Sequence, residues 1–136
     1  MNKSRDNRCS YSQWRREVKK KNSYCLDIDF VEYMMVNDVR VPYALLEVNE
    51  PAMPLDSCNW FKNVHTCKKE QVALLKEFSK RMKLPWFVVL FKVEDGIPKF
   101  KVYNDKRQSE NIYSEEEFLA ILEECKKDAQ NNIKKN

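Results

Sequence analysis

The stretch CLDIDFVEYMMVNDVRVPYALLEVNE, residues 25–50, most constrains what this chain can fold into. Polar and apolar residues alternate along it, which predicts β-strands over residues 24–33 and 41–49, because successive side chains of a strand point to opposite faces. Asn37-Asp38 between them is typical of a turn and predicts an antiparallel hairpin. The apolar faces of both strands would pack against helices.

Both predicted strands carry polar side chains on one face. Asp27 and Asp29 share a face of the first strand. Glu47 and Asn49 share a face of the second strand. Stability alone gives no reason for acids at strand ends, whereas two converging carboxylates supply the oxygen ligands that Mg²⁺ requires, with waters completing its shell. The hairpin is therefore the candidate active site.

Helical spacing of apolar residues predicts two helices, one on each side of the hairpin. The first covers residues 10–21. After the hairpin, Pro51 and Pro54 interrupt the pattern, and residues 50–66 form an irregular excursion of a length that is usually functional or mobile. The second helix covers residues 67–83. Its predicted buried face consists of Gln71, Leu74, Leu75, Phe78 and Met82.

Three ring-bearing residues lie in this excursion: Trp60, Phe61 and the only histidine, His65. We expect Trp60 and Phe61 to pack the excursion against the core, with stacking on nucleobases as the alternative. A lone histidine is more often structural or solvent-facing than catalytic.

The last third of the chain predicts two strands and a helix. Residues 86–91 form a near-continuous apolar run, as expected of a central strand that is covered on both faces. Asp95-Gly96 predicts a second hairpin turn into a strand over residues 99–103, whose lysines would face water. The capping-box pattern of residues 114–117 starts the last helix.

The order of elements is therefore α-β-β-α-β-β-α. A strand–helix–strand connection from Glu47 to Trp86 predicts a parallel pairing with a right-handed crossover. The sequence thus predicts a single α/β domain, a mixed central sheet flanked by helices, over residues 10–130. Residues 1–9 are expected to be a flexible basic lead-in and residues 131–136 a polar tail.

Composition excludes several classes of protein. The chain of 136 residues is 43% hydrophobic and 34% charged, which fits one globular domain. A single glycine excludes Gly-rich phosphate-binding loops. No apolar run approaches the roughly 20 residues that span a bilayer, and no secretory signal follows the basic N-terminus. We therefore expect no membrane partner and a cytoplasmic location.

The five cysteines are scattered, and their odd number fits reduced thiols better than disulfides. Cys58, His65 and Cys67 could, together with Cys9, offer zinc four ligands. However, the sequence has no C-x-x-C pair, and the spacing matches no common zinc module. Isolated thiols are the favoured interpretation.

Basic residues concentrate near the N-terminus. Residues 1–22 hold eight lysines and arginines against two acids, Asp6 and Glu17, which leaves a charge of +6. Such a segment beside an acidic metal site is compatible with a polyanion such as DNA. A solvated helix face explains the charge equally well.

The order of these polar residues resembles that of the PD-(D/E)xK nuclease superfamily, which has the restriction-endonuclease-like fold. The resemblance spans about residues 10–103 and is strongest to small resolvase-like members and to the branch with a helix-borne glutamine. It rests on a helix with Glu17, a strand with Asp29, an antiparallel strand ending Glu47-Val48-Asn49, and a helix with Gln71.

The resemblance implies roles for these residues. Asp29, Glu47 and the backbone carbonyl of Val48 would hold Mg²⁺ or Mn²⁺. Glu17 would reach the metal through a water molecule. Gln71 would be the helix glutamine of the family, although an amide beside apolar residues can equally be a core-edge group bonded to backbone.

The sequence departs from the family at position 49, where asparagine replaces the motif lysine. A lysine supplies positive charge beside the scissile phosphate, whereas a neutral amide can only orient a water molecule. Lys62, Lys68 or Lys69 could supply that charge from another element. Alternatively, the protein keeps the scaffold and has lost the chemistry.

The leading hypothesis is a hydrolase, a magnesium-dependent endonuclease that cleaves DNA, in which Asn49 positions water and Lys68 or Lys69 compensates for the lost lysine. Contacts to phosphates would come from Arg15, Arg16, Lys19 and Lys20. The resemblance also implies a homodimer. The first alternative is a catalytically inactive module that binds nucleic acid or a protein partner. The second is a small α/β protein whose acids are only solvated strand ends.

Overall fold

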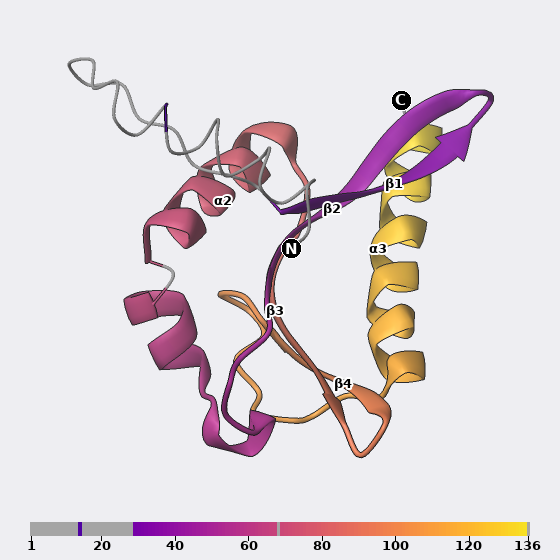
Figure 1. The fold of residues 1–136 in the computed structure, drawn as a ribbon. Helices are drawn as coiled ribbons and strands as arrows, with labels where there is room; N and C mark the ends of the chain where they lie inside the picture. Colours follow the sequence, from indigo (N-terminus) through magenta and orange to yellow (C-terminus); the bar gives the residue numbers. More distant parts are fainter. Residues whose placement is uncertain (1–13, 15–28, 68, 136) are drawn as a thin grey trace.

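The computed structural model describes Trp14 and residues 29–67 and 69–135, and in them the chain is an α/β protein built on one mixed sheet (Figure 1). Its strands are β1 (Phe30–Val36), β2 (Val39–Asn49), β3 (Trp86–Glu94) and β4 (Ile97–Tyr103). They lie in the order β1-β2-β3-β4, with antiparallel outer pairs and a parallel β2–β3 pair. The predicted α/β class, mixed sheet and parallel crossover are confirmed. Of the predicted helix over residues 10–21, only Trp14 lies within the described residues.

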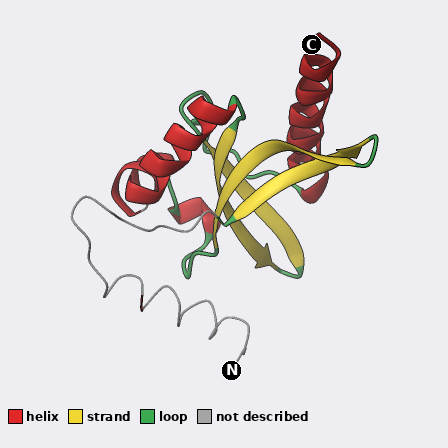
Figure 2. Cartoon of the chain, turned by 90° about the horizontal axis from the view of Figure 1, so that it is seen from above, coloured by secondary structure: helices red, strands yellow, loops and turns green. Residues whose placement is uncertain are grey.

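Two helices cover opposite faces of this sheet (Figure 2). α2 (Lys69–Met82) follows the excursion and packs on one face. α3 (Glu115–Lys135) packs on the other. The excursion contains a 3₁₀ turn, η1 (Leu55–Ser57), and a π-helix, η2 (Phe61–Cys67). The two faces of the sheet are named below the α2 face and the α3 face.

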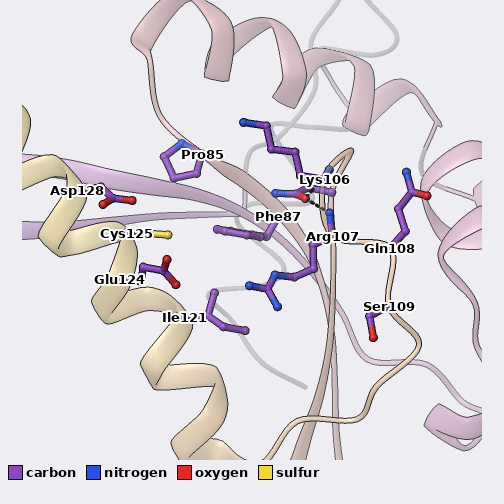
Figure 3. A pocket seen from close by; sticks show the side chains of 11 residues that line it. Pro85, Phe87, Lys106, Arg107, Gln108, Ser109, Ile121, Glu124, Cys125 and Asp128 are labelled. Atoms are coloured by element: carbon purple, nitrogen blue, oxygen red, sulfur yellow. Dashed lines mark hydrogen bonds between the residues drawn. The ribbon is translucent and has the colours of Figure 1, made fainter.

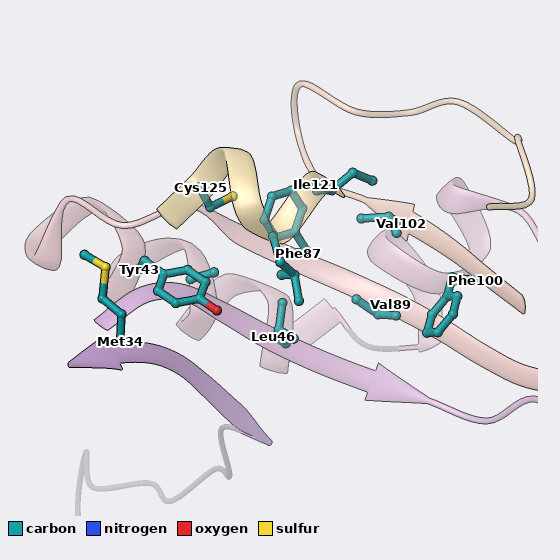
Figure 4. Packing of buried hydrophobic residues seen from close by; sticks show 11 residues of the cluster. Met34, Tyr43, Leu46, Phe87, Val89, Phe100, Val102, Ile121 and Cys125 are labelled. Atoms are coloured by element: carbon teal, nitrogen blue, oxygen red, sulfur yellow. The ribbon is translucent and has the colours of Figure 1, made fainter. Parts of the chain in front are cut away.

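The sheet separates two hydrophobic clusters because the side chains of each strand alternate between the faces. On the α3 face, Leu46, Phe87 and Val89 pack with residues of α3 such as Ile121 (Figure 4). The cluster on the α2 face contains Leu45, Val72, Leu75, Trp86, Val88 and Leu90. β3 contributes to both clusters, which confirms that it is a central strand covered on both sides.

Both predicted hairpin turns are confirmed. Asn37 and Asp38 have φ angles of 49° and 65°, and Asp95 and Gly96 have φ angles of 53° and 75°. Two successive residues with positive φ are what a two-residue type I′ turn requires, and such a turn matches the twist of the flanking strands. The described part of the first hairpin begins at Phe30, later than the predicted start of the strand.

β1 is an edge strand with a largely apolar surface. It pairs with β2 on one side, and among the described residues no strand pairs with its other side. About half of the surface of four of its side chains is exposed: Phe30, Val31, Tyr33 and Met35. The hairpin formed by β1 and β2 extends alongside α3 (Figure 1).

The last helix begins as predicted. The Ser114 hydroxyl accepts a hydrogen bond from the Glu117 amide at 3.2 Å, and the Glu117 carboxylate accepts one from the Ser114 amide at 2.9 Å. These reciprocal bonds satisfy two amides of the first turn that have no partner within the helix. The helix continues through Lys135, past the predicted start of the polar tail at residue 131.

Predictions about side-chain exposure in β4 and α2 are wrong in part. The lysines of β4 were expected to face water, but Lys101 is only 2% exposed, because the excursion and the segment after β4 cover that face. On α2, the predicted burial of Leu75 is confirmed, but Phe78 and Met82 are 40% and 47% exposed, and Val72, which was not predicted, is buried. The buried side of α2 is therefore rotated from the predicted one.

The end of α2 provides a test of backbone strain. Lys83 has a φ angle of 58°, and the Leu84 amide after it donates to the Ser79 carbonyl at 3.1 Å. This is the arrangement of a Schellman cap, in which glycine is preferred because a Cβ atom is unfavourable at positive φ. We predict that Lys83→Gly raises the free energy of unfolding by about 1 kcal/mol.

Urea denaturation of the two proteins measures this change. Lys80→Gly is the control, because glycine inside the same helix should lower the free energy of unfolding by about 1 kcal/mol. A decrease for Lys83→Gly would contradict the assignment of the cap.

Candidate functional site

The β1–β2 hairpin brings the predicted acidic residues to one end of the sheet. The Val48 amide donates a hydrogen bond to Oδ2 of Asp29 at 3.0 Å. Phe30 pairs with Leu46, and continuing this register by one residue sets Asp29 opposite Glu47. Residues opposite each other in antiparallel strands project from the same face. Two segments that are 19 residues apart in the sequence thus meet at the predicted site.

The two acids lie in different environments. Glu47 is only 3% exposed, whereas Asp29 is exposed. Glu47 lies between Leu45 and Asn49 along β2 and is paired with Val88 of β3, so it projects on the α2 face. Among the described residues Glu47 is the only buried acid, and a buried carboxylate is costly unless other groups compensate its charge.

Asn49 and the predicted residues of α2 lie on the same side of the sheet. Asn49 is half-buried and pairs with Leu90, which belongs to the cluster on the α2 face. Gln71 is half-buried in the first turns of α2, next to the buried Val72, and Lys69 begins that helix and is exposed. The α2 face therefore carries Glu47, Asn49 and the start of the helix with Gln71.

Other predicted residues lie outside the described part of the chain. They are the acid Glu17, the phosphate-contacting residues Arg15, Arg16, Lys19 and Lys20, and Lys68. Their roles stay predictions.

The donors at the hairpin suit a hard cation with few protein ligands. Within the described residues, no group of three or more His, Cys, Asp or Glu side chains is placed to hold a metal ion. Mg²⁺ is commonly held by one or two carboxylates with waters completing the shell. The Asp29 carboxylate accepts one amide bond, and a carboxylate can accept more than one contact. Asp29, Glu47 and the Val48 carbonyl therefore fit Mg²⁺ in ligand type and number.

Lys92 is tied to the chain that leaves β2. Its ammonium group donates to the carbonyls of Pro51, Ala52 and Met53 at 3.1, 2.9 and 2.9 Å. An ammonium group has three N–H donors, so these bonds use all of them. Lys92 lies two residues after Leu90 on the same face of β3, and it fixes the first turn of the excursion instead of facing a substrate.

Lys101 anchors a later part of the excursion. It pairs with Leu90 and is almost completely buried, and its ammonium group donates to the Cys58 carbonyl at 2.7 Å. It also forms an ion pair with Oε2 of Glu110 at 3.1 Å. Tyr103, two positions later and so on the same face of β4, is also buried.

Glu110 is the centre of a hydrogen-bond network that we call the Lys101–Glu110 network. Besides Lys101, it accepts bonds from the Tyr103 hydroxyl at 2.7 Å and from the Trp60 amide at 3.0 Å. Partial burial alone would raise the pKa of Glu110, but the bonds from Trp60, Tyr103 and Lys101 outweigh burial and lower it. Burial and the bond to Glu110 raise the pKa of Tyr103, which keeps its hydroxyl a donor.

The cysteine and the histidine of the excursion differ in exposure. Cys58 is a buried free thiol whose Sγ contacts the Pro54 carbonyl at 3.7 Å. Burial raises the pKa of this thiol. His65 is exposed, and its ring lies 4.7 Å from that of Trp60.

A surface pocket of about 480 Å³ lies elsewhere, between α3 and the loop after β4 (Figure 3). Lys106 and Arg107 line one side of it, and Glu124 and Asp128 line the other. Its floor includes Phe87, which belongs to the cluster on the α3 face. Glu47 projects on the opposite face of the sheet, so this pocket is not part of the predicted site.

Comparisons with known proteins give no relative. No protein-family model, no curated protein and no solved structure matches this chain. Among the described residues, no helix has the length and the apolar character needed to cross a lipid bilayer.

The Lys101–Glu110 network generates a pH prediction. The pKa of Glu110 is lowered in the folded protein, so its stabilising contribution is present above its unfolded value of 4.5 and is lost as the pH falls through the folded value. We predict that Glu110→Gln makes the folded protein less stable at pH 7 and less sensitive to acid below pH 4.5.

Thermal unfolding of both proteins across this pH range measures the effect. Glu123→Gln on the exposed side of α3 is the matched control and should follow the parent protein. Parallel pH curves for Glu110→Gln and the parent protein would contradict the role of Glu110.

Proposed function

We propose that this protein is a metal-dependent nuclease that hydrolyses phosphodiester bonds of DNA. The observation that carries the proposal is the meeting of Asp29 and β2, where the Asp29 carboxylate accepts the Val48 amide beside the buried Glu47. Further support comes from the part of the predicted order that the structure describes: the antiparallel pair β1 and β2, then α2 with Gln71, then β3 parallel to β2.

Each residue of the hairpin would have a separate part in the reaction. Asp29, Glu47 and the Val48 carbonyl would hold Mg²⁺ or Mn²⁺, which supplies a water of lowered pKa and stabilises negative charge on phosphate when bound. The amide of Asn49 would orient the attacking water. From the start of α2, the side-chain amide of Gln71 would donate a hydrogen bond toward the substrate side of the site.

The source of positive charge decides how active this site is. Lys92 and Lys101 lie on the same face of the sheet, but backbone carbonyls and Glu110 hold their ammonium groups. Lys69 is exposed at the start of α2, the helix that packs on this face. It is therefore the described lysine that best replaces the motif lysine.

A second candidate is a module on the same scaffold that binds nucleic acid without cleaving it. The engagement of Lys92 and Lys101 favours it, because neither lysine is available to compensate for Asn49. In this case the acids would weaken phosphate binding by repulsion, and their removal would tighten it.

Cleavage of supercoiled and branched DNA with Mg²⁺ or Mn²⁺ tests the proposal. We predict that Asp29→Asn and Glu47→Gln each lower the cleavage rate at least 100-fold, because each removes charge that holds the metal. Asp29→Asn is the cleaner test, since Asp29 is exposed and its change should leave the fold intact. Glu123→Gln is the control. Equal cleavage by all four proteins would refute the site.

Asn49→Lys tests the missing charge. It restores a cation beside the acids, and we predict that it raises the cleavage rate about tenfold or more, through stabilisation of the charge that develops on phosphate. In the parent protein, Lys69→Gln should lower the cleavage rate. The same change should have a smaller effect in a protein that also carries Asn49→Lys. If Asn49→Lys leaves the rate unchanged, our account of position 49 is wrong.

A further inference from the structure

An aromatic side chain is exposed to solvent at the start of η2. Phe61, the first residue of the π-helix, is 62% exposed. Its ring lies 5.3 Å from that of His65, with 44° between the planes, and 6.2 Å from that of Trp60. We call Trp60, Phe61 and His65 the aromatic cluster. The sequence prediction that both Trp60 and Phe61 pack against the core is correct for Trp60 and wrong for Phe61.

The base of this cluster is held firmly. The Trp60 amide donates to Glu110 at 3.0 Å, and the Trp60 ring packs against the hydrophobic cluster on the α2 face. Beside it, the Lys62 amide donates to Oδ1 of Asn59 at 2.7 Å, which caps the start of η2. Phe61 is thus an exposed ring on a fixed backbone, so a ligand would lose little by ordering it.

The sequence segment that carries the cluster is basic, and the acid that contacts the cluster, Glu110, is paired with Lys101. From Asn59 to Lys69 the sequence is NWFKNVHTCKK, which contains three lysines and no acid. Lys62 follows Phe61 directly and is exposed, as is Lys69 at the start of α2. An aromatic ring between cations is typical of surfaces that bind single-stranded nucleic acid, where bases stack and phosphates are neutralised.

The cluster also lies on the side of the sheet that carries the candidate site. η2 packs against α2, and Trp60 packs against the hydrophobic cluster on the α2 face, which includes Val88, the β3 residue paired with Glu47. A nucleic acid held at the hairpin could therefore continue along the α2 face to Phe61.

We propose that the exposed face of Phe61, supported by His65, stacks on an unpaired nucleobase and so gives the protein a preference for nucleic acid with single-stranded segments. This inference rests on the proposed function, because it takes nucleic acid to be the ligand. It adds the structural class of the substrate, since bases inside an intact duplex have no face free for stacking.

Binding measured without metal separates this inference from the cleavage chemistry. The full chain in EDTA is titrated into labelled oligothymidine and into a labelled blunt duplex of equal length, with fluorescence anisotropy as the readout. We expect tighter binding of oligothymidine, and Phe61→Ala should weaken it about tenfold, a loss within the range measured for a single base–aromatic stack. Phe61→Tyr keeps a ring and should retain most of the affinity.

The control is Leu119→Ala, which removes a side chain of similar exposure (54%) from α3 on the other side of the sheet. This change should alter neither the affinity for oligothymidine nor the affinity for the duplex. The stacking role is refuted if Phe61→Ala leaves the affinity for oligothymidine within twofold of the parent protein, or if it weakens binding of oligothymidine and of the duplex equally. Neither result decides whether the protein is a nuclease, which the cleavage assay tests separately. If the chain binds neither ligand, both the inference and the nucleic-acid function are refuted.

Discussion

The ion pair between Lys101 and Glu110 is the interaction on which the α2 face of this protein depends. A buried ammonium group is unfavourable unless a counter-charge and hydrogen bonds replace water. Here the Cys58 carbonyl and Glu110 do so, and Glu110 also binds the Trp60 amide. One charge pair therefore connects β4, the excursion and the segment after β4. The position of α2 follows, since η2 of the excursion packs against that helix.

Two lysines on this face serve the backbone and not a substrate. Lys92 binds the carbonyls of residues 51–53 just after β2 ends, and Lys101 binds the carbonyl of Cys58. Both therefore hold loop carbonyls that have no strand partner, which explains how an irregular segment of this length stays close to the sheet. These two lysines of the sheet are thus committed to structure, while position 49 carries a neutral amide.

The sequence predicted those features that depend on local chemistry. The two type I′ turns, the capping box at Ser114 and the apolar β3 each depend on a few neighbouring residues, and all were found. At the candidate site, alternation correctly placed Glu47 and Asn49 on one face, and the turn set the pairing that brings Asp29 to Val48.

What sequence analysis missed depends on contacts between distant segments. Alternation in β4 separates its two faces but does not tell which of them another segment covers, so Lys101 was wrongly placed in water. The bond from Lys101 to Cys58 spans 43 positions, and the bond from Trp60 to Glu110 spans 50. No local pattern distinguishes Trp60, which packs inward, from its neighbour Phe61, which does not.

The apolar edge of β1 has a consequence for how the protein behaves in concentrated solution. Most edge strands are protected by charged side chains, proline or short length, since their open backbone groups can recruit another strand. β1 has seven residues, of which Glu32 alone is charged, and its Tyr33 and Met35 are more than half exposed. The hairpin that aligns Asp29 with Glu47 is thus also the part of the described fold most prone to intermolecular strand addition and aggregation.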